Sequence, residues 1–150
     1  MITKTTKMTL LEEGRLEQFP HLNFYASEDS LVYFDATHYF EVKNLNKTCS
    51  IEKFCSEFAT WIEPAQRTYG MSPDVMFVQD AKTEHQMVHE SIMVLFLAYT
   101  DEEYRVAILE RVFEMEVTGA CMSDPRLIEA VKNRFSKEFA AKMMEEYGQE

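Results

Sequence analysis

The sequence predicts an α+β protein whose strands pair mainly antiparallel. Short β-rich runs occur as two pairs, at residues 22–25 and 31–34 and again at residues 75–78 and 86–88, with a polar turn inside each pair. Two stretches with the apolar spacing of helices follow each pair. Hairpins that alternate with helix pairs favour this class over a parallel sheet, in which single strands alternate with single helices.

The N-terminal residues are expected to form a helix. Thr9 and Glu12 have the spacing of a capping box, in which each side chain bonds the backbone N–H of the other residue. This spacing predicts a helix over residues 10–18. Residues 1–19 are therefore expected to be a helical extension before a domain that covers residues 20–117.

The stretch LVYFDATHYF, at residues 31–40, is expected to join a strand to a helix. Its first four residues are β-formers and complete the first hairpin. Asp35 and Thr37 can each accept a hydrogen bond from the first N–H groups of a helix that runs from Thr37 to about Leu45. The stretch is therefore expected to aim the helices that follow it.

A second helix is expected after a turn at residues 46–48. Ser50 has the side chain of a helix cap, and apolar residues recur behind it at Ile51, Phe54, Phe58 and Ile62. Pro64 is expected to end this helix, because proline lacks the N–H that a helix interior uses. Residues 64–73 are then expected to form a loop.

The second half of the chain follows the same plan. After the second hairpin, an apolar helix is expected over residues 90–98. Thr100 and Glu103 form another capping box, which begins a helix. Residues 123–150 are expected to form a C-terminal amphipathic helix, which packs on its own domain or pairs with a second chain. Its apolar stripe consists of Leu127, Val131, Phe135, Phe139 and Met143.

The overall composition is typical of a folded intracellular protein. The chain has 150 residues, of which 46% are hydrophobic, and its net charge of −11 disfavours non-specific contact with nucleic acid or anionic membrane. The longest apolar run, residues 92–98, is far shorter than a membrane span. We therefore expect no membrane contact and a cytoplasmic location.

The residue patterns predict no catalytic activity, no metal and no cofactor. His85 and His89 are four residues apart, but Gln86 stands where the HExxH zinc motif has glutamate. The four glycines are scattered, so no phosphate-binding loop is expected. No CxxC pair occurs among the cysteines, which are Cys49, Cys55 and Cys121.

Two motifs in this order resemble the KilA-N domain of large DNA viruses and bacteriophages, and the related APSES DNA-binding domain of fungal transcription factors. The first motif is VYFDATH at residues 32–38, where these families have a hairpin strand, an Asn-Ala-Thr-like signature and a helix. The second motif is MVHESI at residues 87–92 with FLAYTDEEY at residues 96–104. It is similar to the family's Val-His-Pro, Ala-x-Trp turn and Phe-bearing final helix. The resemblance covers residues 20–115.

Three residues depart from the family pattern. Asp35 stands in place of the signature Asn, Glu90 in place of the Pro after the histidine, and Tyr99 in place of Trp. The resemblance implies two hairpins and paired helices in a winged helix-turn-helix-like fold. It also implies a role in DNA-linked regulation without catalysis, in a phage or mobile element.

Double-stranded DNA is the partner that the resemblance implies. Residues 36–55 contain three lysines against two glutamates, whereas residues 71–150 contain eight basic against sixteen acidic residues. The second helix is expected to face the major groove, and the tip of the second hairpin is expected to act as a wing. The candidate DNA contacts are Lys43, Asn44, Asn46, Lys47, Thr48, Ser50 and Lys53 in the helix pair, with Gln79 and Lys82 on the hairpin.

A second function stays open beside DNA binding. A net charge of −11 also suits an acidic protein-interaction module on the same fold. Such a module binds a host or phage protein and makes no DNA contact. In either case the C-terminal helix remains a candidate homodimer surface.

Overall fold

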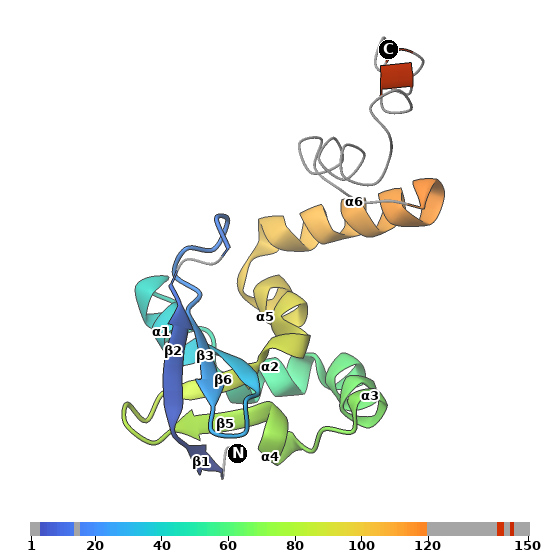
Figure 1. Cartoon of the computed structure of the whole chain (residues 1–150). Helices are drawn as coiled ribbons and strands as arrows, with labels where there is room; N and C mark the ends of the chain where they lie inside the picture. The colour runs from blue at the N-terminus through green and yellow to red at the C-terminus, as the bar shows by residue number, and fades with distance from the viewer. Residues whose placement is uncertain (1–3, 14–15, 120–140, 143–144, 146–150) are drawn as a thin grey trace. The chain divides into compact units, whose positions relative to one another are not determined.

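The computed structural model describes residues 4–13, 16–119, 141, 142 and 145. The chain divides into two compact units, Met1–Arg105 and Val106–Glu150. The first unit contains a mixed α+β fold built on one sheet (Figure 1). The C-terminal helix expected over residues 123–150 lies almost wholly outside the described residues.

Six strands of the described chain form the sheet, in the order β1-β5-β6-β4-β3-β2. All neighbouring pairs are antiparallel except β1 with β5, which is parallel. The two expected hairpins are confirmed as β3–β4 and β5–β6. The strands are β1 (Thr5–Thr6), β2 (Met8–Glu12), β3 (Phe24–Ser27), β4 (Val32–Asp35), β5 (Phe77–Asp80) and β6 (Gln86–His89).

The sheet is curled by its N-terminal strands. Only Lys7 separates β1 from β2, yet these strands occupy opposite edges of the sheet. Thr6 pairs with Asp80 on β5, and Met8 pairs with Ser27 on β3. Because a two-residue step along the chain joins the two edges, β1 and β2 leave little of either edge open for pairing with another protein.

Along the described chain, four helices come between β4 and β5, and the remaining helical elements follow β6. The helix pair that follows β4 is α1 and α2, and α6 is the long helix that ends the continuous described chain (Figure 1). The helical elements are α1 (Ala36–Val42), α2 (Ile51–Glu57), α3 (Ala59–Tyr69), α4 (Pro73–Met76), the 3₁₀ turn η1 (Glu90–Ile92), α5 (Met93–Thr100) and α6 (Glu102–Thr118).

The main core is aromatic and centres on Phe96 of α5. Its side chain is fully buried, and its ring centroid lies 4.9–5.7 Å from the centroids of four other rings, in Phe34, Tyr39, Phe40 and Phe54. Phe24, Phe34, Phe77 and Val88, which belong to four different strands, face this core. The helices of the first unit that contribute to this core, α1 to α5, therefore cover one face of the sheet.

The opposite face of the sheet carries a smaller cluster and several polar groups. Side chains alternate along a strand, so the neighbours of the core residues point the other way. Tyr33, Val78 and Met87 form the buried centre of this cluster. Asp35 lies two residues from Tyr33 and Asp80 two residues from Val78, so both carboxylates are on this opposite face, where they are buried.

The helix expected over residues 10–18 is wrong, because residues 8–12 form β2. Leu10 pairs with Tyr25, so the backbone groups of this segment bond to β3 instead of to one another. The capping-box spacing is a local signal, and the open edge of β3 outcompetes it. Residues 5–12 accordingly belong to the sheet rather than to a helical extension.

The helix end expected at Pro64 is also wrong, and the loop expected over residues 64–73 is confined to residues 70–72. Pro64 lies inside α3, which continues to Tyr69 and ends at Gly70 with φ 63°. The break occurs earlier, at Phe58, where α2 ends and α3 begins. A proline removes one helical hydrogen bond, and the burial of Ile62 in the core opposes this cost.

Two further boundaries differ from expectation. The residues Val75 and Met76 belong to α4, so the strand begins at Phe77. The helix expected over residues 90–98 is a 3₁₀ turn followed by α5. Within the described residues, no helix is both long enough and apolar enough to cross a membrane.

Candidate nucleic-acid interface

The turn between α1 and α2, residues 43–50, is shaped by its own hydrogen bonds. The Lys43 N–H donates to the Tyr39 carbonyl and the Asn44 N–H donates to the Glu41 carbonyl, and these bonds end α1. Asn44 takes a left-handed conformation with φ 56°, which asparagine adopts more readily than most residues. This reversal leads the chain away from α1 and into the turn.

Ser50 holds the start of α2 in two ways. Its Oγ accepts from the Lys53 N–H at 3.1 Å, which confirms the expected cap, and its own N–H donates to the Tyr99 hydroxyl at 3.2 Å. Tyr99 thus ties α5 to the turn. Ser50 is half-buried, and its hydroxyl already accepts the hydrogen bond that caps α2.

Positive charge gathers on the turn rather than on the exposed face of α2. Lys43 and Lys47 are exposed, and so are the three polar candidates Asn44, Asn46 and Thr48. Lys53 lies on α2, but its Nζ donates to the Thr48 carbonyl of the turn at 3.3 Å. The exposed residues of α2 itself are Glu52, Lys53, Ser56 and Glu57, with two negative charges against one positive charge.

The tip of the β5–β6 hairpin is a rigid turn built on Asp80. Its Oδ2 accepts from the Thr83 hydroxyl at 2.6 Å and from the Thr83 N–H at 3.1 Å. Burial by itself raises the pKa of the Asp80 carboxyl, but these bonds and other backbone N–H groups outweigh it, so its pKa lies below the usual value. Gln79 braces the tip, because its Nε2 donates to the Glu84 carbonyl at 3.0 Å.

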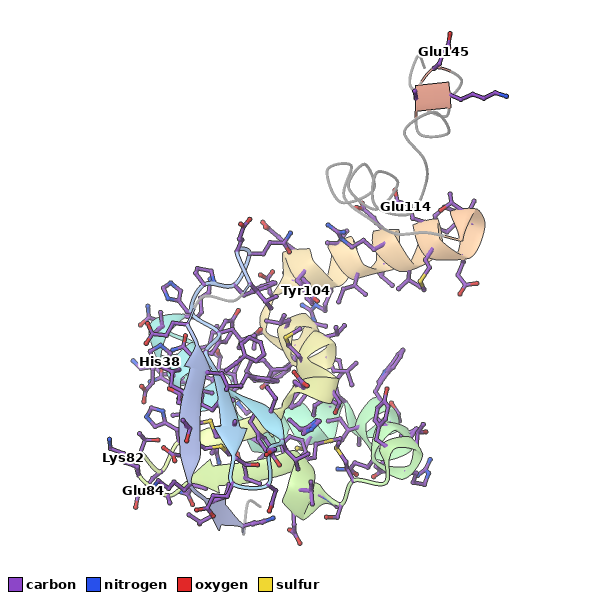
Figure 2. The ribbon with its side chains drawn as sticks, viewed as in Figure 1. His38, Lys82, Glu84, Tyr104, Glu114 and Glu145 are labelled. Carbon is purple, nitrogen blue, oxygen red and sulfur yellow. The ribbon has the colours of Figure 1, made fainter. Side chains whose placement is uncertain are left out.

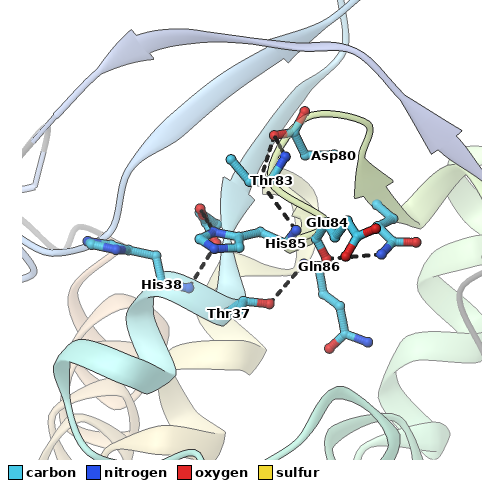
Figure 3. A network of polar contacts seen from close by, with 9 residues as sticks. Thr37, His38, Asp80, Thr83, Glu84, His85 and Gln86 are labelled. Atoms are coloured by element: carbon cyan, nitrogen blue, oxygen red, sulfur yellow. Dashed lines mark hydrogen bonds and ion pairs between the residues drawn. The ribbon is translucent and has the colours of Figure 1, made fainter.

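A pair of polar contacts fastens this hairpin to the start of α1 (Figure 3). His85 Nδ1 lies 2.7 Å from Asp35 Oδ2, and the Gln86 N–H donates to the Thr37 hydroxyl at 2.8 Å. We call these four residues the hairpin latch. Asp35 also caps α1, since its Oδ1 accepts from the His38 N–H at 2.9 Å.

The latch corrects one expectation and adds a residue. The cap of α1 is Asp35, whereas the Thr37 hydroxyl accepts from the hairpin instead of from the helix. Asp35 can serve both partners because a carboxylate has two oxygens. The sequence does not indicate the contact of His85 with Asp35, because no local pattern relates residues 50 positions apart.

The candidate residues fall into two groups at opposite ends of α1. Lys82 points outward at the hairpin tip (Figure 2), and the latch holds this hairpin at the N-terminus of α1. Lys43 and Lys47 follow the C-terminus of the same helix. The seven residues of α1 span roughly 10 Å, and this length separates the latch from the turn.

A groove lies between α2 and α3. Its volume is about 340 Å³. Ile51, Ile62 and Phe77 supply apolar walls, while Glu52 and Glu63 lie at its rim. Cys55 also lines it, and burial raises the pKa of this thiol, so it is not an activated nucleophile.

His89 is a buried histidine at the end of β6, and it serves the fold. Its Nδ1 accepts from the Ser91 N–H at 3.2 Å, and its ring meets the Tyr33 ring edge-on at 5.4 Å. Burial lowers the pKa of the imidazole below its usual 6.5, although the Glu90 carboxylate opposes this shift. In the described part of the chain, no three His, Cys, Asp or Glu residues are placed to hold a metal ion.

Acid is expected to destabilise the protein through His89. Because its pKa is lower in the folded state, the unfolded chain binds a proton first. The stability that it contributes is complete above about pH 6.5 and is lost as the pH falls, at no more than about 1.4 kcal/mol per pH unit. Urea unfolding at about pH 7.5 and about pH 5.5 should show a smaller loss for His89→Gln than for the unaltered chain. Equal losses in the two proteins would contradict this role, since all other histidines are unchanged.

No protein-family model matches this sequence, and no similar protein was found among curated proteins or solved structures.

Proposed function

We propose that the chain is a non-enzymatic DNA-binding regulator, which contacts duplex DNA through the α1–α2 turn and the β5–β6 hairpin tip. The observation that carries this proposal is the hairpin latch. It fixes the hairpin at one end of α1 while the lysine-bearing turn follows the other end. Exposed lysines held at a set spacing can contact phosphates on both sides of a groove. The resemblance to KilA-N domains supports the same reading and suggests a phage or mobile-element setting.

The overall charge limits how such contacts can form. The net charge of −11 repels DNA overall, so binding depends on the exposed lysines named above. Lys43 and Lys47 on the turn are expected to contribute most, and Lys82 is expected to add a further phosphate contact. The polar side chains of Asn44 and Asn46 lie beside the two turn lysines and are the candidates for base-edge or sugar contacts.

Charge reversal on the turn tests the proposal. The triple variant Lys43→Glu, Lys47→Glu, Lys53→Glu should weaken binding to a fluorescent duplex by more than about a hundredfold at about 50 mM salt. The slope of log affinity against log salt should also become shallower by about one for each phosphate that the variant no longer neutralises. Fluorescence anisotropy measures both quantities.

A matched variant separates a local effect from a global one. Lys4→Glu, Lys7→Glu, Arg67→Glu changes the net charge by the same amount at exposed positions outside the turn and hairpin. This control should keep most of the affinity. If the unaltered protein shows no duplex binding at about 50 mM salt, or if both triple variants lose affinity equally, the proposal is wrong.

The groove between α2 and α3 favours a second candidate, an acidic module that binds a protein. Its apolar walls and glutamate rim suit a basic amphipathic segment of a partner. This function requires no lysine on the turn. It predicts that the turn variant binds such a partner as well as the unaltered chain does, whereas Glu52→Lys with Glu63→Lys does not.

A further inference from the structure

Helix α6 exposes large apolar side chains over most of its length. Leu109 and Phe113 are 70% and 69% exposed. Successive residues of an α-helix are rotated by about 100° around its axis, so these apolar side chains occupy about 200° of the circumference of α6. The polar remainder holds Glu110, Arg111 and Glu114. The exposed apolar residues are Val106, Leu109, Val112, Phe113, Met115 and Val117. An exposed arc of this size marks a surface that another element covers.

Two charged residues, Arg105 and Glu116, lie inside this apolar arc. They are eleven residues apart, which is three helical turns, so they project along nearly the same line. Leu109 and Val112 lie between them, and the resulting 4-3-4 spacing is that of a coiled-coil seam. The rise along the helix separates the two charges by roughly 16 Å, so they cannot pair with each other.

We propose that α6 pairs with α6 of a second copy of this chain, in the antiparallel direction. In that arrangement Arg105 of each copy meets Glu116 of the other, and Leu109 meets Val112. The contact is isologous, since each pairing occurs twice about a two-fold axis. A parallel pair would place Arg105 against Arg105 and is disfavoured. The positions of Arg105 and Glu116 at opposite ends of the seam therefore favour pairing with a second copy of α6, in the antiparallel direction.

The size of the surface sets the expected strength. A 17-residue helix is roughly 25 Å long, so a single helix pair buries less than a standard interface. The dimer is therefore expected to be weak, with a Kd in roughly the micromolar range. The two ion pairs set register and direction more than affinity. This inference does not depend on DNA binding.

Complementary charge reversals in the full chain provide the test. Sedimentation equilibrium of the unaltered protein should show a mass that rises from monomer to dimer with concentration. Arg105→Glu alone and Glu116→Arg alone should each weaken the dimer by about tenfold or more, because each places like charges opposite each other. An equimolar mixture of the two variants should recover dimerisation, because opposite charges then face each other again at both ends of the seam.

Matched variants on the polar side of α6 complete the design. Arg111→Glu and Glu114→Arg make the same charge changes outside the apolar arc and should leave the dimer unchanged. Circular dichroism confirms that each variant is folded. A monomer at all concentrations overturns the proposal and indicates that α6 is covered by another segment of its own chain. A dimer that neither single reversal weakens, or that the mixture fails to restore, overturns it as well.

Discussion

Phe96→Ala is expected to lower the free energy of unfolding by about 3–5 kcal/mol, which is the typical cost of removing a fully buried aromatic ring. Phe96 is 0% exposed, and its ring packs against rings from β4, α1 and α2. The surrounding rings are themselves buried and fixed by other contacts, so they cannot close the cavity fully. A loss of this size is a large part of the stability of a typical domain.

The measurement is urea unfolding followed by circular dichroism. Val94→Ala is the matched control, because Val94 lies on the same helix but is 46% exposed. The control should change stability by less than about 0.5–1 kcal/mol. If Phe96→Ala costs no more than the control, Phe96 is not the centre of the core.

Asp35→Ala is expected to lower the free energy of unfolding by about 3 kcal/mol. Loss of the helix cap contributes about 1 kcal/mol. The larger part comes from the latch, because the His85 ring nitrogen loses the carboxylate oxygen that lies 2.7 Å away. Asp35 is 2% exposed, so water reaches this side of the contact poorly. The hairpin should also separate more readily from α1.

Two readouts distinguish the latch from a simple cap. Asp35→Asn keeps an oxygen for the His38 N–H, so it should lose less stability than Asp35→Ala. Amide hydrogen exchange at Gln86 should accelerate in Asp35→Ala and in Thr37→Ala, because both substitutions weaken the attachment of the hairpin. Unchanged exchange at Gln86 in both variants would show that the hairpin stays in place without these side chains.

The parts of the fold that were predicted correctly depend on local signals. The two hairpins have β-rich runs separated by polar turns, and Ser50 caps α2 from three residues away. Asp35 was expected among the residues that bond the start of α1, and it does so. These contacts join residues close in sequence, so their residue types are enough to indicate them.

The parts that were wrong depend on distant partners. The capping-box spacing at residues 9–12 is overridden because β3 offers hydrogen bonds to this segment. Pro64 does not end a helix because Ile62, two residues earlier, is anchored in the core. Neither β3 nor the core is visible in a window of a few residues.

The candidate interface divides in the same way. The sequence by itself determined the lysine-bearing turn, the polar hairpin tip and the strand-to-helix stretch LVYFDATHYF, because charge, turn residues and caps are local properties. Only the tertiary structure decided that Asp35 meets His85, 50 residues away, and that the hairpin therefore lies at the N-terminus of α1. The physical reason is the pairing of β4 with β6, which brings these two residues together through backbone hydrogen bonds that no side-chain pattern encodes.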